Sequence, residues 1–339
     1  MSTDLVTLGK KDFTSDQEVR WCPGCGDYAI LAAVQALLPE LGARPESTVF
    51  ISGIGCSSRF PYYMDTYGIH SIHGRAPALA TGLAASRPDL DVWVITGDGD
   101  ALSIGGNHLI HALRRNVNIN ILLFNNEIYG LTKGQYSPTS PLGSKHKSTP
   151  MGSIDRPVNP VSLALGAEAT FVARSIDTDR KHLTSVLRAA YEHRGASFVE
   201  IYQNCVVFND DAFTAVTGKD TKVINQIPLR QGEPIVFGPS GERAVVAEPD
   251  GSMSIVPTEE AGDRVVIHDA HRPEPTTAFA LSRLALTPTG PTPLGIFRDV
   301  EAPVYDDLLN QQVEEAKVRR GEGDLAALLA SGNVWDVMG

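Results

Sequence analysis

Short apolar strands alternate with helical segments from about residue 18 to residue 211, and this alternation limits the possible fold more than any other feature. Runs rich in β-branched and aromatic residues predict strands over 47–55, 90–100, 118–126, 168–174 and 196–204. Helical patterns lie between or beside them over 27–41, 101–115, 159–167 and 179–195. Such alternation predicts an α/β fold in which helices cover both faces of a mostly parallel sheet.

The chain changes character after about Phe213. Short strand candidates separated by turns follow in "TGKDTKVINQIPLRQGEPIVFGPSGERAVVAEPDG", and helices are expected over 303–321 and 323–332. We therefore expect a main domain over residues 18–215. An N-terminal arm (1–17) precedes it, and a C-terminal extension (216–339) is expected to pack on a partner subunit.

Charge and hydropathy argue against two broad classes of protein. Lys and Arg number 29 against 40 Asp and Glu, a net charge of −11 that disfavours nucleic-acid binding, since this requires a basic face. The chain has no apolar run close to the roughly 20 residues that cross a bilayer, and its first residues do not resemble a signal peptide. We expect a cytoplasmic protein with no membrane partner, whose four cysteines are reduced thiols or ligands.

Two polar turns follow neighbouring strands in "TGDGDALSIGGNHLIHALRRNVNINILLFNN". Asp98 and Asn126 are expected at the same edge of the sheet, where ligands of parallel sheets bind. A carboxylate and an amide oxygen suit Mg²⁺ that shares its remaining positions with phosphate oxygens. Gly97 and Gly99 let the backbone approach a diphosphate closely. A lone Gly-Asp-Gly is usually only a tight turn, but its pairing with Asn125-Asn126 one βαβ unit later favours a diphosphate site.

The cysteines form one close pair and two distant singles. Cys22 and Cys25 stand in "WCPGCG", whereas Cys56 and Cys205 each follow a predicted strand. A zinc ribbon normally brings two close pairs together, so this spacing is different. Four thiolates gathered by the fold can hold a [4Fe–4S] cluster. Zinc, a redox disulfide of the close pair and plain packing remain open from the residues alone.

Gly-Asp-Gly followed by Asn-Asn resembles the thiamine diphosphate motif, which also occurs in decarboxylases, transketolases and acetolactate synthases. Five stretches together resemble the β subunit of 2-oxoacid:ferredoxin oxidoreductases, over about residues 13–215, and most closely its 2-oxoglutarate branch. These stretches are "WCPGCG", "GIGCSSR", "HSIHGRAPALATGLA", "GDGDALSIGGNH" and "NNEIYGLTKGQYSPTS".

This resemblance implies specific ligands. Asp98, Asn126 and the backbone carbonyl of Ile128 would bind Mg²⁺, and a [4Fe–4S] cluster would be bound by Cys22, Cys25, Cys56 and Cys205. The implied thiamine diphosphate contacts are Ile54, Gly55, Cys56, Ser57, His73, Gly74, Gly97, Gly99, Asp100, Gly130, Leu131 and Thr132.

Three side chains are candidates for a catalytic role. The resemblance places Lys133 against the far carboxylate of a dicarboxylic 2-oxoacid, which would favour 2-oxoglutarate over pyruvate because an unpaired buried charge is costly. On the residues alone, a solvated loop lysine is the favoured interpretation of Lys133. His73 is expected beside the cofactor, or else bonded to backbone. Arg59 would face substrate or coenzyme A, or pair with a surface acid, and Arg75 is a weaker candidate.

The resemblance implies oxidative decarboxylation of 2-oxoglutarate to succinyl-CoA and CO₂, with electrons passing through the cluster to ferredoxin. Only the diphosphate-binding half of a thiamine enzyme is apparent in the chain, so a separate α subunit should supply the other half in an α₂β₂ heterotetramer. The alternatives are a pyruvate or other 2-oxoacid enzyme, a cluster-free thiamine lyase, and a zinc-stabilised scaffold.

Overall fold

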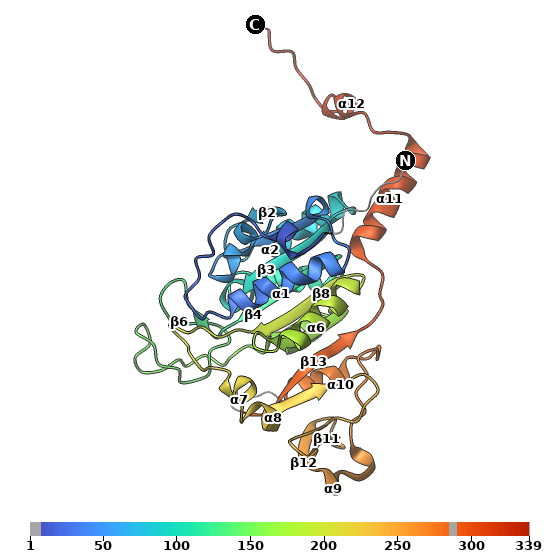
Figure 1. The fold of residues 1–339 in the computed structure, drawn as a ribbon. Coiled ribbons are helices and arrows are strands. Elements are labelled where there is room, and N and C mark those ends of the chain that lie inside the picture. Colours follow the sequence, from blue (N-terminus) through green and yellow to red (C-terminus); the bar gives the residue numbers. More distant parts are fainter. Residues whose placement is uncertain (1–7, 285–289, 339) are drawn as a thin grey trace.

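A single large sheet organises the computed structural model, which describes residues 8–284 and 290–338 (Figure 1). Its eight strands pair in parallel except where β13 meets β7. The predicted strands are confirmed and are adjacent within this sheet. In spatial order the strands are β2 (Tyr67–His70), β1 (Thr48–Ser52), β3 (Asp91–Gly97), β4 (Ile119–Asn125), β8 (Ala196–Tyr202), β7 (Phe171–Ile176), β13 (Thr292–Asp299) and β9 (Gln226–Leu229).

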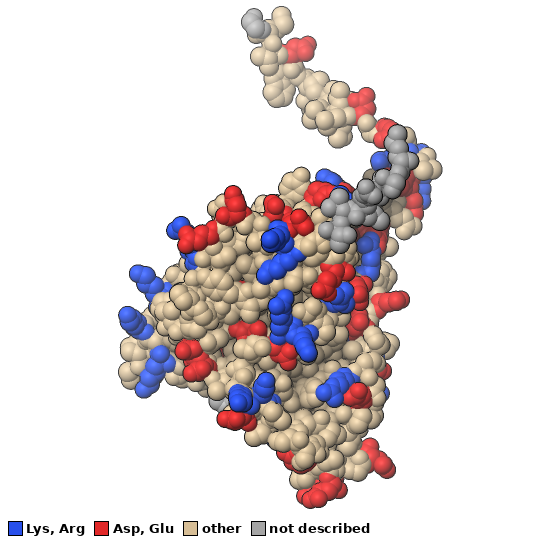
Figure 2. Space-filling view, in the orientation of Figure 1, with Lys and Arg blue, Asp and Glu red and all other residues tan. Residues whose placement is uncertain are grey.

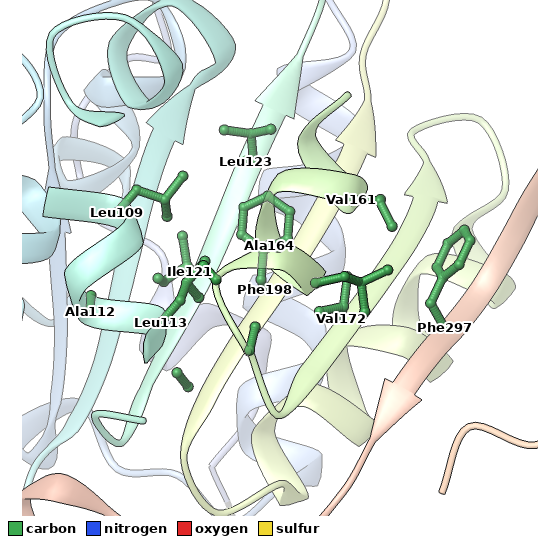
Figure 3. Close-up of a cluster of buried hydrophobic side chains, with 14 of the residues drawn as sticks. Leu109, Ala112, Leu113, Ile121, Leu123, Val161, Ala164, Val172, Phe198 and Phe297 are labelled. Atoms are coloured by element: carbon green, nitrogen blue, oxygen red, sulfur yellow. The ribbon is translucent and has the colours of Figure 1, made fainter. Parts of the chain in front are cut away.

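Helices cover both faces of the sheet, as predicted. Successive strand residues point to opposite faces, so Val49 and Ile51 of β1 pack in one core while Phe50 packs in the other. The first core, part of which Figure 3 shows, lies under α2 (Ala76–Ser86), α4 (Gly106–Arg114), α5 (Pro160–Gly166) and α10 (Thr276–Ser282). The second lies under α1 (Asp27–Glu40) and α6 (Arg180–Glu192).

The helix expected over 101–115 is interrupted, which corrects the prediction. A short helix, α3 (Asp98–Leu102), ends at Ser103, and α4 begins only at Gly106. At the break the chain passes close to the loop after β2: a Cβ on Gly105 would lie 2.5 Å from the Asp100 carbonyl oxygen and 3.0 Å from Gly74 Cα. The turn between α3 and α4 therefore packs against α3 and the loop after β2 with no room for a side chain at Gly105.

The C-terminal extension completes the large sheet, because β9 and β13 are its last two strands. The predicted division at residue 215 thus runs through one sheet. The extension also contains a small sheet of β10 (Val236–Phe237), β11 (Arg243–Ala247) and β12 (Met253–Pro257), with short helices α7 (Thr214–Thr217), α8 (Lys222–Asn225) and α9 (Thr258–Ala261). The expected terminal helices are confirmed as α11 (Tyr305–Arg320) and α12 (Leu325–Leu329), which lead away from the body (Figure 1).

The N-terminal arm is partly packed. Residues 1–7 of the predicted arm lie outside the described residues, while a 3₁₀ turn at Lys10–Phe13 buries the Phe13 ring in the second core. No helix in the described part of the chain combines the length and the apolar character that a bilayer crossing requires. Basic and acidic side chains are interspersed on the face shown in Figure 2.

A fully buried ion pair connects the extension to the sheet edge that carries the predicted site. Arg174 Nε on β7 lies 2.6 Å from Glu200 Oε2 on β8, and both side chains are at most 1% exposed. The guanidinium lies over the ring of Phe297 on β13, 5.4 Å from its centroid. The other carboxylate oxygen of Glu200 accepts a hydrogen bond from Asn125 Nδ2 at 2.8 Å. The last residue of β4 is therefore anchored to a charge that the extension covers.

Candidate functional site

The predicted site residues meet at the carboxyl ends of β1, β3, β4 and β8, around two neighbouring cavities. The first, which we call the strand-end cavity, has a volume of about 60 Å³. The second, of about 280 Å³, is lined by all four cysteines and is called the cysteine cavity. Four residues line both: Cys56, Asn126, Gly130 and Leu131.

The strand-end cavity gathers almost the whole predicted cofactor set. Every residue expected to contact thiamine diphosphate lines it, with the exception of Gly74. The expected Mg²⁺ ligands Asp98, Asn126 and Ile128 line the same cavity. A carboxylate, an amide oxygen and a backbone carbonyl are hard oxygen donors, so this set is chemically suited to Mg²⁺.

Asp98 is held by two hydroxyl groups from a later segment. Its Oδ2 accepts hydrogen bonds from Ser137 Oγ at 2.5 Å and Thr139 Oγ1 at 2.6 Å. Burial raises the pKa of Asp98 to about 6, although these hydrogen bonds lower it. Asp98 is thus a buried carboxylate whose side-chain hydrogen bonds come from uncharged hydroxyl groups, and a bound cation would compensate its charge.

The two asparagines after β4 have different contacts. Asn125 faces inward, where its side chain contacts Glu200 and accepts a hydrogen bond from Thr139 Oγ1 at 2.9 Å. Asn126 instead lines both cavities. Asn125 therefore supports the loop, and Asn126 is the one that can bind a ligand.

Asp100 ties together the loops around the strand-end cavity. Its Oδ1 accepts hydrogen bonds from the backbone N–H groups of Ile54 at 3.1 Å and Gly74 at 2.7 Å. Its Oδ2 accepts one from Thr96 Oγ1 at 2.7 Å, and His73 Nδ1 lies 2.8 Å from Oδ1. These contacts favour a positioning role for Asp100 and Gly74, because their polar groups are already engaged with one another.

Tyr129 was missed by the sequence interpretation, although it lines the strand-end cavity. Its hydroxyl donates a hydrogen bond to the Gly99 carbonyl at 3.0 Å, and its ring lies against Gly99. A Cβ at Gly99 would lie 2.2 Å from the ring atom Cε1, a separation that real Cβ atoms do not show. Gly99 is thus required by Tyr129 in addition to any need for close approach by a cofactor.

We expect Gly99→Ala to weaken thiamine diphosphate binding by at least about tenfold, in the range seen when outer residues of a metal site are changed. The added methyl group must displace the Tyr129 ring, which lines the cavity. Isothermal titration with thiamine diphosphate in excess Mg²⁺ measures the change. Gly106→Ala is the matched control, since a Cβ there meets nothing within 4 Å. Equal affinity of both variants would contradict the assigned role of the ring.

The cysteine cavity collects thiols from three parts of the chain. Cys22 and Cys25 precede α1, Cys56 follows β1 and Cys205 follows β8, and all four are free thiols. A Cβ on Gly130 would lie 3.5 Å from the Cys205 sulfur and 3.6 Å from the Cys56 sulfur. Among the described residues, no three such side chains already stand at metal-binding separation. The cavity that all four cysteines share is therefore what favours a metal–sulfur cluster or zinc here.

Burial and nearby acids disfavour free thiolates in this cavity. Burial, followed by the charge of Asp27, raises the pKa of Cys56 to about 11, and the same causes raise the pKa of Cys25 further. Bound as thiolates, these sulfurs would need a compensating positive charge, which metal ions supply.

The three catalytic candidates line different cavities. His73 lines the strand-end cavity, whereas Lys133 and Arg59 line the cysteine cavity. Arg59 Nη1 donates to the Arg20 carbonyl at 2.8 Å, and Lys133 adopts a left-handed backbone with φ 76°. Arg75 Nη1 donates to the His73 carbonyl at 3.2 Å. Arg75 therefore supports the His73 loop.

Several further residues of the site were not identified from the sequence. Ser137 and Thr139 belong to the quoted stretch ending "YSPTS", whose hydroxyl-rich composition is the only signal for them. Gln203 lies near the end of the last predicted strand, two residues before Cys205, and carries no signal of its own. Trp21 lies beside the first cysteine, and its Nε1 donates to the Cys56 carbonyl at 2.6 Å.

Comparison with known proteins agrees with this geometry. Residues 53–201 match the thiamine pyrophosphate enzyme family, C-terminal TPP binding domain. The chain is 61% identical to the 2-oxoglutarate oxidoreductase subunit KorB of Mycobacterium tuberculosis, over 99% of this chain and 90% of that protein. The chain belongs to the family of 2-oxoacid:ferredoxin oxidoreductase β subunits. The predicted family and thiamine-diphosphate-binding fold are confirmed.

Two more distant members of the family extend the comparison. Subunit beta of 2-oxoacid:ferredoxin oxidoreductase 1 from Aeropyrum pernix is 42% identical, over 78% of this chain and 80% of that protein. A solved structure of the 2-oxoglutarate:ferredoxin oxidoreductase from Magnetococcus marinus covers 98% of both chains at 34% identity, with a TM-score of 0.75. The likeness to this oxidoreductase structure therefore includes the C-terminal extension.

Proposed function

We propose that this chain is the β subunit of a coenzyme A-dependent 2-oxoglutarate:ferredoxin oxidoreductase. In this reaction 2-oxoglutarate, coenzyme A and two oxidised ferredoxins give succinyl-CoA, CO₂, two reduced ferredoxins and a proton. The 61% identical relative is named as a 2-oxoglutarate oxidoreductase subunit. The Magnetococcus marinus structure is described with 2-oxoglutarate, coenzyme A and succinyl-CoA bound.

The observation that carries the proposal is the common wall of the two cavities. Cys56, Asn126, Gly130 and Leu131 line both, so a group in the strand-end cavity and a metal held by the cysteines would be neighbours. Neighbouring cofactors suit an oxidative reaction, in which electrons leave the substrate carbon for a nearby acceptor. When bound, thiamine diphosphate supplies carbanion stabilisation and a [4Fe–4S] cluster accepts single electrons.

The chain's own residues bind and orient these groups. Asp98, Asn126 and the Ile128 carbonyl would bind Mg²⁺ at the diphosphate, and Cys22, Cys25, Cys56 and Cys205 would bind the cluster. Asp100 holds the loops after β1 and β2 in position by its hydrogen bonds to Ile54 and Gly74. The cofactor contacts inferred from the resemblance are proposed for the residues that line the strand-end cavity.

We also propose an α subunit as partner, within an α₂β₂ heterotetramer, and ferredoxin as the external electron acceptor. The "subunit beta" in the names of relatives supports a separate α subunit. The end of the chain supports a contact with it, because apolar side chains beyond α11 are exposed: Leu325 69%, Leu328 68%, Leu329 74%, Val334 65% and Trp335 80%. Surfaces of this kind mark protein contacts.

We expect Lys133→Ala to raise the KM for 2-oxoglutarate by roughly tenfold or more and to change the KM for pyruvate little. A hydrogen bond to a charged group contributes about 1.5–3 kcal/mol, and pyruvate has no second carboxylate to lose it. Alanine and lysine are similarly disfavoured in the left-handed backbone conformation of this position, so the substitution tests the loss of the charged side chain. Steady-state kinetics of the complex with both acids measures the effect, and Lys147→Ala is the control. Equal effects on both acids would return Lys133 to a solvated loop role.

The metal content of the complex tests the proposed function. Iron, zinc and the EPR spectrum after dithionite reduction should be measured on anaerobically purified chain co-expressed with its α subunit. We expect roughly four irons per chain and the signal of a reduced cluster. Zinc, or intact protein without metal, would favour a zinc site or a cluster-free thiamine lyase. Activity with pyruvate but not with 2-oxoglutarate would assign the chain to a pyruvate enzyme instead.

A further inference from the structure

One buried side chain bonds both to a residue that the two cavities share and to a cysteine. Gln203 follows β8, is 1% exposed and lines the cysteine cavity. Its Oε1 accepts a hydrogen bond from Asn126 Nδ2 at 2.8 Å, and its Nε2 lies 3.2 Å from the Cys25 sulfur. We propose that Gln203 is a positioning residue that holds Asn126 in the orientation of a Mg²⁺ ligand and donates an N–H to the Cys25 sulfur, raising the reduction potential of the cluster. This inference rests on the proposed cluster and Mg²⁺ sites.

The hydrogen-bond network allows only one orientation of the two amides. The backbone N–H of Ile128 can only donate, so the Asn126 atom that it meets at 3.2 Å is Oδ1. Asn126 Nδ2 therefore faces Gln203, which must present Oε1 to it. Gln203 Nε2 is left to donate to the Cys25 sulfur and to the Asn204 carbonyl at 2.5 Å. The neighbouring groups thus fix which end of each amide is the oxygen and which is the nitrogen.

Close packing keeps Gln203 in this position. A Cβ on Gly26 would lie 3.0 Å from Gln203 Cγ and 1.9 Å from Asp177 Oδ2, so the turn before α1 passes directly over the side chain. The Gly26 N–H also donates to the Asn204 carbonyl at 3.2 Å. A glutamine held on two sides loses little further freedom when it binds its neighbours, which makes its hydrogen bonds effective.

The contact with sulfur has a predictable electronic effect. An N–H donor beside a ligating sulfur stabilises the more negative, reduced form of a cluster, and hydrogen bonds to sulfur are among the factors that set its potential. The series of hydrogen bonds from Asn126 through Gln203 to Cys25 also predicts coupling between the two cavities. An amide whose oxygen binds a cation becomes a stronger N–H donor, and hydrogen bonds in series polarise one another. Asn126 and Gln203 are in series between the metal ligand set and Cys25.

The test is a redox titration followed by EPR, on the αβ complex with a full complement of iron. We expect Gln203→Leu to change the oxidised-to-reduced ratio at a fixed potential by about tenfold in favour of the oxidised form, which is about 59 mV for one electron. Its affinity for Mg²⁺-thiamine diphosphate should fall by about 10–100-fold. Gln226→Leu is the control, because this glutamine on β9 donates to the Val216 carbonyl, far from both cavities.

Gln203→Glu separates the two contacts. A carboxylate still accepts from Asn126 Nδ2, so affinity for Mg²⁺-thiamine diphosphate should stay within about threefold of the wild type. It has no N–H for the Cys25 sulfur and adds a negative charge beside it, so the potential should fall at least as far as in Gln203→Leu. Because a purely structural residue would lose both properties in both variants, this pattern identifies a positioning role.

Two results would overturn the inference. If the Gln203→Leu complex has full iron and an unchanged midpoint potential, the proposed effect of the Gln203 contact on the Cys25 sulfur is wrong. If the affinity for Mg²⁺-thiamine diphosphate is unchanged, the proposed role of Gln203 in orienting Asn126 is wrong. This affinity can be measured even if the variant assembles no cluster. A wild-type complex without iron would instead defeat the proposed function itself, so the two failures are distinguishable.

Discussion

Asp98→Ala should abolish Mg²⁺-dependent binding of thiamine diphosphate, with an affinity loss greater than about 100-fold. That figure is the upper end of what outer residues of metal sites contribute, and Asp98 is proposed as a direct ligand. It is the only carboxylate in its proposed ligand set, so neutral oxygens alone would be left to bind a divalent cation. Isothermal titration at saturating Mg²⁺ measures the loss.

The same variant should keep its folded stability, which separates a binding role from a structural one. Burial raises the pKa of Asp98 to about 6, so burial disfavours its ionised form when no cation is bound. Removing it leaves Ser137 and Thr139 with other polar neighbours, since Ser140 Oγ and Asn125 Oδ1 are within hydrogen-bond distance of them. Asp91→Ala, at the opposite end of β3, is the control. Tight Mg²⁺-dependent binding by Asp98→Ala would refute the metal assignment.

Cys205→Ser should reduce the iron content from roughly four per chain to nearly none. Serine replaces a thiolate with a hydroxyl that stays protonated at neutral pH and binds iron weakly. The Cys205 sulfur flanks Gly130, beside the strand-end cavity, so its loss opens the cluster at the common wall. Iron analysis and the visible spectrum of anaerobically purified complex measure the effect.

Val207→Ala controls for disturbance of the same loop. Val207 also lines the cysteine cavity and is 54% exposed, so its truncation leaves the sulfur ligands and the core unchanged. Full iron in this variant and loss in Cys205→Ser would assign the effect to the thiol. An unchanged iron content in Cys205→Ser would show that Cys205 is a packing residue.

The centre of the fold was predictable because its strands are buried on both faces. Continuous apolar runs such as "VWVIT" and "ILLF" leave little alternative to central parallel strands. The edge was not: β2 (Tyr67–His70) is exposed along its length and has no apolar signature. Strand β13 was also missed, since "TPLGIFRD" begins with turn-forming residues and pairs with β7 from far along the chain. Local patterns report burial, and they do not report distant pairing.

The site divides in the same way. Residues with distinctive chemistry, such as Asp98, Cys56 and Cys205, were expected at the strand ends and lie there, because parallel strands bring the loops that follow them to one edge. Residues that act through a neighbour were not found. Gln203 and Thr139 are ordinary polar residues in the sequence, and only the distances to Cys25 and Asp98 reveal their part. Supporting contacts depend on three-dimensional placement that spacing does not encode.

The buried ion pair between Arg174 and Glu200 bears on how this subunit can be dissected and recombined. Removing either partner of such a pair typically costs about 3–5 kcal/mol, since the remaining charge stays buried without compensation. The guanidinium is covered by Phe297, which lies well outside the matched domain at residues 53–201. Both charged partners lie inside that domain, so a chimera that exchanges it between relatives keeps the pair but loses its own Phe297 cover unless strand β13 is transferred as well. The modular boundary of the enzyme follows the electrostatics of the sheet, and this boundary differs from the limits of the recognisable family domain.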